Sequence, residues 1–413
     1  MKKFKTIDII SGLLLLSLGT VVGFQVGTSD WWQYHQLTKS ANQNSSSGQS
    51  NTADLKVFWE VWQKLEKKYL NAEDLDSTIM VQGATSGLAS SLGDPYTVYL
   101  EPETNQTSGE AITGAFYGVG IEMGYIENTL SVISPIKGSP AEAAGIQAGD
   151  LLIHVKDEAA GIDEDLFDKS SYDAMRLIRG QSKSPVTITL WRQDYNDNQY
   201  FDITIIRDEI KIPSLELTFV NNSEGKKIAH LELSTFSANT YQEWEAAVQQ
   251  ILNESNVDGI ILDLRNNTGG IFEESIHIAN EFIAADEVIV REEGREGENA
   301  HNQVFTANGR GRLQNRPLAV LINGGSASAS EIVAGALRDQ TEATLVGTKT
   351  FGKGLVQERF SLSDGGGLHI TIARWKLPKG DWIQDNGIAP EVEVSYNPET
   401  DIDDVLTKAL SLF

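Results

Sequence analysis

The chain has 413 residues, with 33 Lys or Arg against 58 Asp or Glu, so its formal net charge at pH 7 is −25. A surface this negative repels phosphate backbones and anionic lipid, which argues against a nucleic-acid-binding protein. The absence of cysteine excludes disulfides, cysteine–zinc sites, thiol catalysis and a lipidated cysteine anchor. The six histidines form no metal-binding pair, and we expect neither a metal nor a cofactor.

The N-terminus resembles a membrane signal anchor. Three lysines among the first five residues precede an apolar stretch, Ile9–Val26. Eighteen helical residues would span about 27 Å, close to the ~30 Å core of a bilayer. The charge distribution predicts an N-in, C-out orientation, and no A-x-A cleavage pattern follows. We therefore expect a single-pass anchor in the cell membrane, with the rest of the chain in the bacterial cell envelope; the alternative is a buried core helix. The polar tract Gln36–Asn51 predicts a flexible tether.

Beyond the tether, hydrophobic spacing and turn residues predict two kinds of element. Helices are expected at Asp54–Tyr69, Ser77–Leu92, Pro140–Ala144, Ser171–Ile178, Thr240–Glu254, Ile271–Ala284, Ser328–Arg338 and Ile402–Phe413. Strands are expected at Val186–Trp191, Phe201–Ile206, Ile228–Leu233, Gly259–Leu264, Leu318–Ile322, Thr344–Val346, Gly354–Phe360 and Leu368–Trp375. The strand–helix alternation from Lys227 onward predicts a layered α/β core within a chain that is α+β overall.

A run of small residues, Asn323–Glu331 (NGGSASASE), joins a buried strand to a helix. A serine at the start of that helix lies near the positive end of the helix dipole, which favours an alkoxide or oxyanion. Ser328-x-x-Glu331 is also a capping box, which needs no catalytic role. The segment taken alone leaves both interpretations open.

A lysine follows in Gly347–Gln357 (GTKTFGKGLVQ), which nearly matches a phosphate-binding loop but has Gly354 at the final Ser/Thr position. A strand rather than a helix follows, so an NTPase is a poor interpretation. The alternation places Lys353, Leu355 and Gln357 on one face. A desolvated Lys353 would have a lowered pKa and could act as a general base, whereas a solvated surface lysine is the alternative.

A third element, Asp258–Gly270 (DGIILDLRNNTGG), carries a buried strand into a glycine-rich turn. The N–H groups of Gly269 and Gly270 could point at an anion there and form an oxyanion hole. We expect Asp263 and Arg265 to form a structural ion pair.

In this order the three elements resemble the carboxyl-terminal processing proteases, the S41 family of serine peptidases. LGDPYTVYLEPE, SPAEAAGIQAGD and NGIAPEVEV match the family as well, so the resemblance covers about Phe58 to Phe413. It implies a Ser–Lys dyad of Ser328 and Lys353, supported by Gln357. Ser326, Ser330 and Lys349 are the rival positions. The resemblance also implies an oxyanion hole from the N–H groups of Gly269, Gly270 and Ala329; Thr268 stands where the family usually has Pro.

A second resemblance is to a PDZ domain. Gly118-Val-Gly-Ile121, SPAEAAGIQAGD and YDAMRLIRG carry it. A glycine-rich loop before a strand offers N–H groups to a peptide's terminal carboxylate, and the strand edge pairs with the peptide. The pocket residues it implies are Tyr117, Gly118, Val119, Gly120, Ile121 and Met175. Arg179 is expected to contact the protease body, and a PDZ fold serving only as a spacer is the alternative.

Together these patterns predict a membrane-tethered serine endopeptidase that recognises C-terminal tails of extracytoplasmic proteins. Its expected parts are an anchor (1–27), a linker (28–52), a helical region (53–103), a PDZ domain (104–195), an S41 core (196–397) and a C-terminal helix (398–413). Protein substrates with exposed C-termini and a possible homodimer are the expected partners, and nucleic acid is not. A catalytically silent PDZ adaptor and an acyl-CoA enzyme of the crotonase type remain as alternatives.

Overall fold

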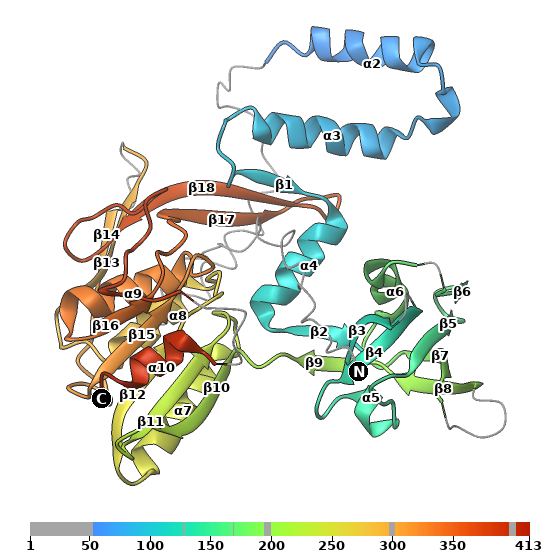
Figure 1. Ribbon diagram of the computed structural model, residues 1–413. Coiled ribbons are helices and arrows are strands. Elements are labelled where there is room, and N and C mark those ends of the chain that lie inside the picture. The colour runs from blue at the N-terminus through green and yellow to red at the C-terminus, as the bar shows by residue number, and fades with distance from the viewer. Residues whose placement is uncertain (1–52, 127–128, 168, 194–199, 297–301, 396–401) are drawn as a thin grey trace, which may run out of the picture.

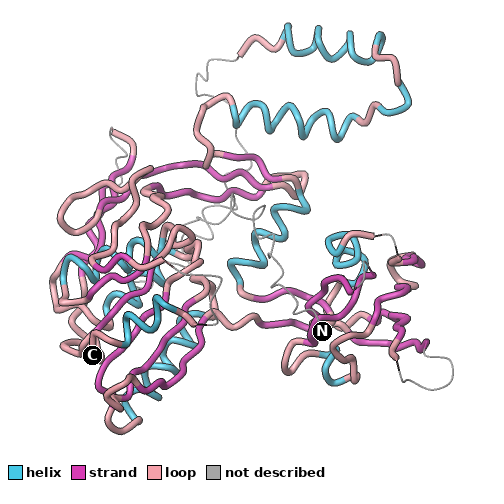
Figure 2. Tube along the Cα trace, viewed as in Figure 1, coloured by secondary structure: helices cyan, strands magenta, loops and turns pink. Residues whose placement is uncertain are grey.

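A computed structural model describes residues 53–126, 129–167, 169–193, 200–296, 302–395 and 402–413 (Figures 1 and 2). Its helices are α2 (Lys56–Lys68), η1 (Ala72–Asp74), α3 (Ser77–Ser90), α4 (Pro102–Thr113), α5 (Pro140–Ala143), α6 (Ser171–Ile178), α7 (Thr240–Asn253), α8 (Phe272–Asn280), α9 (Ala329–Gln340) and α10 (Asp404–Leu410). None of the helices in these ranges is long and apolar enough to cross a membrane. The anchor and tether expected before residue 53 lie outside the described residues.

The strands form four sheets, and most of them belong to one of two domains. The strands of the small domain and its connection are β2 (Ala115–Gly118), β3 (Ile121–Ile126), β4 (Thr129–Pro135), β5 (Leu151–Asp157), β6 (Ile162–Asp165), β7 (Pro185–Trp191), β8 (Tyr200–Ile206) and β9 (Asp208–Lys211). Those of the large domain are β1 (Val98–Leu100), β10 (Leu215–Asn221), β11 (Lys227–Leu233), β12 (Val257–Asp263), β13 (Val288–Gly294), β14 (Asn302–Thr306), β15 (Leu318–Ile322), β16 (Thr344–Gly347), β17 (Leu355–Ser361), β18 (Gly367–Lys376) and β19 (Val392–Glu393).

A six-stranded sheet forms the centre of the large domain, in the order β10-β11-β12-β15-β16-β19. Within this sheet, β11, β12, β15, β16 and β19 run parallel to one another, and β10 pairs with β11 in the antiparallel direction at the edge. Such strands are buried on both faces and read as continuous apolar runs, and all five residues of β15 are buried. The expected layered α/β core is therefore confirmed. Because parallel strands end at one edge, the turns after β12 and β15 lie side by side.

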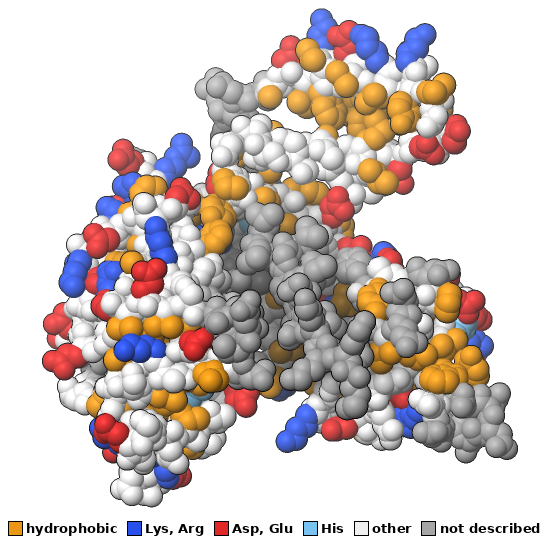
Figure 3. All heavy atoms as spheres, viewed as in Figure 1, with side chains coloured by type: hydrophobic (Ala, Val, Ile, Leu, Met, Phe, Trp, Pro, Cys, Tyr) orange, Lys and Arg blue, Asp and Glu red, His pale blue; other side chains and the backbone are white. Residues whose placement is uncertain are grey.

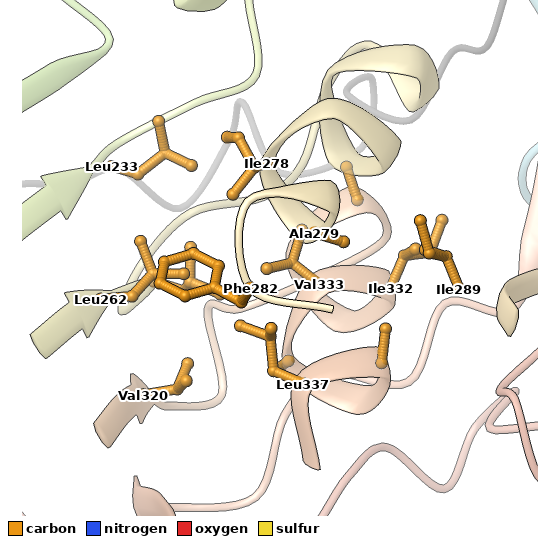
Figure 4. Close-up of a cluster of buried hydrophobic side chains, with 14 of the residues drawn as sticks. Leu233, Leu262, Ile278, Ala279, Phe282, Ile289, Val320, Ile332, Val333 and Leu337 are labelled. Atoms are coloured by element: carbon orange, nitrogen blue, oxygen red, sulfur yellow. The ribbon is translucent and has the colours of Figure 1, made fainter. Parts of the chain in front are cut away.

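Helices cover both faces of this sheet. On one face, side chains of α8 and α9 meet Leu233, Leu262 and Val320 from the strands (Figure 4). On the other face, α10 contributes Val405 and Ala409 to a smaller cluster. Burying this much apolar surface holds the strand ends, and the turns that follow them, in fixed positions.

An antiparallel sheet built around β18 extends from the large domain. β18 pairs with β1, β13 and β17, and β13 pairs with β14. The long β17–β18 hairpin carries Gln357 opposite Thr371 and Arg359 opposite His369. The β13–β14 hairpin was not expected from the sequence, because its charged residues Arg291, Glu292 and Glu293 obscure the strand pattern.

The small domain has its own sheet, in the order β3-β4-β5-β7-β8, with α5 and α6 beside it. A separate cluster of buried residues, including Leu152, Ile188 and Leu190, forms its core. The expected boundary at residue 195 would cut this sheet, because β8 pairs with β7 along its whole length.

α4 is a further element that sequence patterning missed. Its sequence, PETNQTSGEAIT, lacks an apolar periodicity, and only Ser108 is buried. Pro102 at its start and the left-handed Gly114 at its end are the signals that mark it. α4 runs from the β17–β18 hairpin towards the small domain (Figure 1), and Asn105 donates a hydrogen bond to the Gly365 carbonyl.

Elsewhere the elements lie close to expectation, with differences at their ends. α6 and β15 match the predicted bounds, and α8 ends earlier than Ala284. After Asn280 the chain tightens, because Glu281 N–H and Phe282 N–H bond three residues back rather than four. Such tightened last turns are invisible to hydrophobic spacing.

Candidate active site

Ser328 sits in a strained turn between β15 and α9. It is the N-cap of α9, it is 3% exposed, and its φ is +53°, a value that non-glycine residues rarely adopt. Strain of this kind concentrates at functional sites and persists only where surrounding structure enforces it. A strand–turn–helix with a strained serine at its tip presents the nucleophile in the α/β-hydrolases.

Neighbouring serines in the run have structural partners. The Ser326 hydroxyl donates to the Leu264 carbonyl at 2.8 Å, and the Ser330 hydroxyl donates to the Asn267 carbonyl at 2.7 Å. Within the described residues, Ser328 Oγ donates no hydrogen bond. Its proton is therefore available to a base, whereas those of Ser326 and Ser330 hold the β12 and β15 turns together.

Glu331 links the serine turn to the lysine segment. Its buried carboxylate accepts hydrogen bonds from the main-chain N–H of Ser328, Gly352 and Lys353, and from the Thr350 hydroxyl. Ser328 N and Lys353 N are each 2.9 Å from the same oxygen, Oε2. Burial raises the pKa of Glu331, although these four hydrogen bonds lower it. The predicted capping box is present, but it also positions a second segment.

Lys353 is buried just before β17, with 7% of its surface exposed. Burial lowers the pKa of Lys353 to about 8, against the opposing effect of the Glu331 and Asp94 carboxylates. Its ammonium lies over the Tyr96 ring, 4.9 Å from the centroid. Lys349, the rival position, is exposed. Lys353 is therefore the lysine of this segment whose environment suits a base.

Gln357 lies on β17, the strand that begins after Lys353, and is buried. Its Nε2 donates to Thr371 Oγ1 at 3.3 Å. Its Oε1 is buried without a hydrogen-bond partner among the described residues. An acceptor left unsatisfied in the interior is costly unless a donor arrives, such as an ammonium or a substrate N–H.

Sequence reasoning missed the contribution of the segment before β1. Asp94 and Tyr96 were given no role at the site from the sequence, yet the Asp94 carboxylate acts on the pKa of Lys353 and the Tyr96 ring lies under its ammonium. Burial would raise the pKa of Asp94, but hydrogen bonds from Thr371, Thr97 and the Tyr96 main chain bring it below its usual value. Asp94 therefore stays ionised beside the site, and no periodicity in the sequence could reveal this.

The glycine turn after β12 packs directly against the serine. A Cβ added to Gly269 would lie 2.9 Å from Ser328 Cβ, and one added to Gly270 would lie 2.1 Å from the Phe236 carbonyl. Gly269 N–H donates to Asn267 Oδ1 at 2.9 Å, so it is engaged in the turn rather than offered to an oxyanion. The N–H groups of Gly270 and Ala329 donate no hydrogen bond within the described residues. These two N–H groups are available to a ligand.

Asp263 and Arg265 form the expected ion pair at 2.5 Å, and Arg265 also meets Asp403 at 2.9 Å. Arg265, which follows β12, thereby links the turn after this strand to Asp403 at the start of α10. In the part of the chain that the structure describes, no group of three or more His, Asp or Glu side chains is placed to hold a metal ion.

The small domain carries a groove of about 340 Å³ between β3 and α6. Its lining residues are Phe116, Gly118, Val119, Gly120, Ile121, Met123, Ser171, Met175, Ile178 and Arg179. Five of the six residues expected in the pocket are among them. Tyr117 is not: its side chain is half exposed, and its neighbour Phe116 faces the groove instead, because alternate residues of β2 point to opposite sides.

Arg179 connects this groove to α4 rather than to the sheets of the large domain. Its guanidinium pairs with Glu110 and lies over the Phe116 ring, 4.4 Å from the centroid. One turn earlier on α6, Arg176 pairs with Glu103. Both glutamates belong to α4, which therefore contacts the small domain along its length.

Comparison with protein families gives three matches. Residues 227–394 match the model of peptidase family S41, residues 131–192 match the PDZ domain, and residues 16–104 match the activating protease CtpB N-terminal domain. Among solved structures, a putative S41 protease from Bacteroides fragilis aligns with a TM-score of 0.53 at 16% identity, over 86% of this chain and 96% of that one. At that identity the likeness supports the fold alone.

Curated relatives are more similar in sequence. A carboxyl-terminal-processing protease from Synechocystis is 37% identical over 82% of this chain and 76% of its own length. The carboxy-terminal processing protease CtpA of Bacillus subtilis is 33% identical over 85% of this chain and 70% of its own length. The chain therefore belongs to the S41 peptidases, as a serine-type carboxyl-terminal processing protease with a PDZ domain.

Proposed function

We propose that this peptidase uses Ser328 as nucleophile and Lys353 as general base. One observation carries the proposal: a buried lysine, with its pKa lowered to about 8, is joined through Glu331 to the strained turn that holds Ser328. A serine without a histidine partner needs a neutral amine to remove its proton. Burial supplies such an amine at moderately alkaline pH.

The reaction is acyl transfer in two steps. Neutral Lys353 Nζ takes the proton of Ser328 Oγ as Oγ attacks the scissile carbonyl, and the Gly270 and Ala329 N–H groups bind the resulting oxyanion. The Lys353 ammonium then gives its proton to the leaving amine, which departs and leaves an acyl ester on Ser328. Water, deprotonated by the same lysine, hydrolyses the ester. Gln357 Oε1 accepts from the ammonium when it forms.

The pH dependence follows from the base. Only neutral Lys353 can accept a proton, so kcat should rise with pH through a midpoint near the lysine's pKa of about 8 and fall about tenfold per pH unit well below it. A pH–rate profile with a saturating peptide checks this. A midpoint near the ordinary lysine value, or a flat profile between pH 6 and 9, would contradict the role of Lys353.

The groove between β3 and α6 is proposed to hold the C-terminus of the substrate. The lining glycines 118 and 120 leave room for a terminal carboxylate beside main-chain N–H groups, and Ile121 and Met175 offer apolar surface to the last side chain. Met175→Asp should weaken binding of an apolar-tailed peptide by about tenfold or more, because a carboxylate buried against the apolar last side chain would lose its hydration without gaining a partner. Fluorescence anisotropy measures it. Phe167→Asp, an exposed position outside the groove, is the matched control and should bind as wild type.

The single-pass anchor, the cell-membrane location and the extracytoplasmic position of the catalytic part stay proposals from the sequence pattern before residue 53.

A homodimer is proposed as well. α2 buries none of its residues, and the exposed rings of Phe58 and Trp59 contact the half-buried ring of Trp62 on it. Figure 3 shows apolar side chains gathered on the hairpin that α2 forms with α3. Trp59→Glu should shift the sedimentation coefficient to that of a monomer if a second copy covers this face.

Degradation of an unfolded protein with an apolar C-terminus tests the proposed function. The full chain should cleave this protein and release peptides, and amidation of the substrate's C-terminus should slow cleavage. Binding of the tail without any cleavage would favour the silent adaptor instead. Hydrolysis of an acyl-CoA thioester would favour the crotonase type.

A further inference from the structure

Arg359 lies on β17 two residues beyond Gln357, and strand alternation places both side chains on the same face. Across the hairpin they face Thr371 and His369 of β18. Arg359 lies six positions after Lys353, which precedes β17, and two positions after Gln357, which belongs to it. Arg359 is therefore on the strand of Gln357, further along the chain from Lys353.

Among the described residues, the hydrogen-bond partners of the Arg359 guanidinium are neutral. Its Nε donates to His369 Nε2 at 3.0 Å, and its Nη2 donates to Ser108 Oγ at 3.2 Å. Burial, together with the charges of Arg359 and Lys353, lowers the pKa of His369 to about 4. His369 is thus a neutral acceptor at physiological pH. Nη1 of Arg359 makes no hydrogen bond within the described residues.

Several partly or fully buried arginines of this acidic chain pair with carboxylates, whereas Arg291 and Arg316 donate to main-chain carbonyls. Arg207 pairs with Asp157, Arg265 with Asp263, and Arg312 with Glu281. Arg359 has no carboxylate within 4.0 Å among the described residues, and burial lowers its pKa. A desolvated guanidinium that keeps donors to spare is suited to bind a planar carboxylate from outside, through two parallel hydrogen bonds.

The position of Arg359 matches the route of a bound polypeptide. Ser108, its second partner, belongs to α4, and α4 pairs with α6 beside the groove of the small domain. A chain whose end lies in that groove and whose scissile bond lies at Ser328 has to cross the region that α4 spans (Figure 1). Arg359 lies where α4 meets β17, between the two.

We propose that Arg359 is a specificity-determining residue, which binds the carboxylate of an acidic side chain of the substrate polypeptide several residues beyond the scissile bond, on its C-terminal side. The proposal rests on the proposed protease function and deepens it. The substrate's terminal carboxylate is assigned to the groove of the small domain, and the test below distinguishes the two carboxylates.

The test compares peptides of one length and one apolar tail that carry Glu or Gln at a single position, scanned from about four to about eight residues beyond the scissile bond. At one of these positions the full-length wild type should show a kcat/KM about tenfold higher for Glu. Arg359→Gln should remove that ratio, Arg359→Lys should keep part of it, and Arg310→Gln, an exposed arginine, should leave it intact. A second pair of peptides differs only in having a free or an amidated C-terminus. If Arg359→Gln reduces the difference in kcat/KM within this pair, and not the Glu preference, the ligand is the terminal carboxylate.

Binding of the same peptides to the Ser328→Ala chain separates this inference from catalysis. If wild type cleaves nothing but the Glu preference appears in the Kd and vanishes with Arg359→Gln, the carboxylate site stands and the protease mechanism fails. If Arg359→Gln weakens the binding and cleavage of all peptides equally, or if the Glu preference remains in this variant, Arg359 only holds α4 in place and the inference is wrong. Unfolding midpoints of the variants show whether a uniform loss comes from misfolding.

Discussion

Ser328→Ala and Lys353→Met should each reduce peptide cleavage by about 10⁴-fold or more, while Ser326→Ala retains most activity. Ser328→Ala removes the attacking oxygen. Lys353→Met keeps the length and apolar body of the side chain but removes the amine that accepts the proton. Because the two groups act in one step, the double variant should be little worse than either single variant. Steady-state kinetics with a fluorogenic peptide measure all four chains.

Ser326→Ala is the matched control in that series. Its hydroxyl donates to the Leu264 carbonyl and accepts from the Asn323 N–H, so the substitution removes two hydrogen bonds and should lower the free energy of unfolding by about 2 kcal/mol. If a folded Ser326→Ala variant were inactive and Ser328→Ala were active, the nucleophile would be Ser326 rather than Ser328.

Glu331→Gln should reduce kcat by about 10²-fold to 10³-fold, since misplacing a catalytic group by about 1 Å costs that much. The carboxylate accepts from four donors, whereas an amide turns an NH₂ group towards some of them. The Ser328 turn and the Lys353 segment would then separate. Glu331 acts through other residues and is a positioning residue.

A shifted pH profile distinguishes this role from general destabilisation. The negative charge of Glu331 raises the pKa of Lys353, so removing that charge should lower it. The residual activity of Glu331→Gln should therefore have its midpoint below the wild-type value of about 8. Glu342→Gln, an exposed position beyond the end of α9, should change neither kcat nor midpoint. An unshifted midpoint in Glu331→Gln would show that its charge does not reach the lysine.

The α/β core was predictable because its signals are local. β15 is five buried apolar residues between turns, and α6 and α9 begin at serine caps. Ser328, Lys353 and Gln357 were predicted from their motif and spacing; all three are buried, and Glu331 links the main chains of Ser328 and Lys353.

What could not be predicted depends on segments far apart in the chain. Asp94 and Tyr96 reach Lys353 only because β1 pairs with β18, and α4 is held by long-range hydrogen bonds and ion pairs rather than by an apolar face. The engagement of Gly269 N–H by Asn267 and the positive φ of Ser328 are properties of the folded turn. Local propensity carries no information on either.

The most direct measurement is the site of covalent labelling by a serine-reactive phosphonate with an apolar peptide tail, located by mass spectrometry of the digested protein. The Ser–Lys account predicts modification of Ser328 alone, with a labelling rate that rises with pH through about 8, the pKa of Lys353, and disappears in Lys353→Met. Modification of Ser326 or Ser330, or labelling of Ser328 that persists unchanged in Lys353→Met, would contradict it.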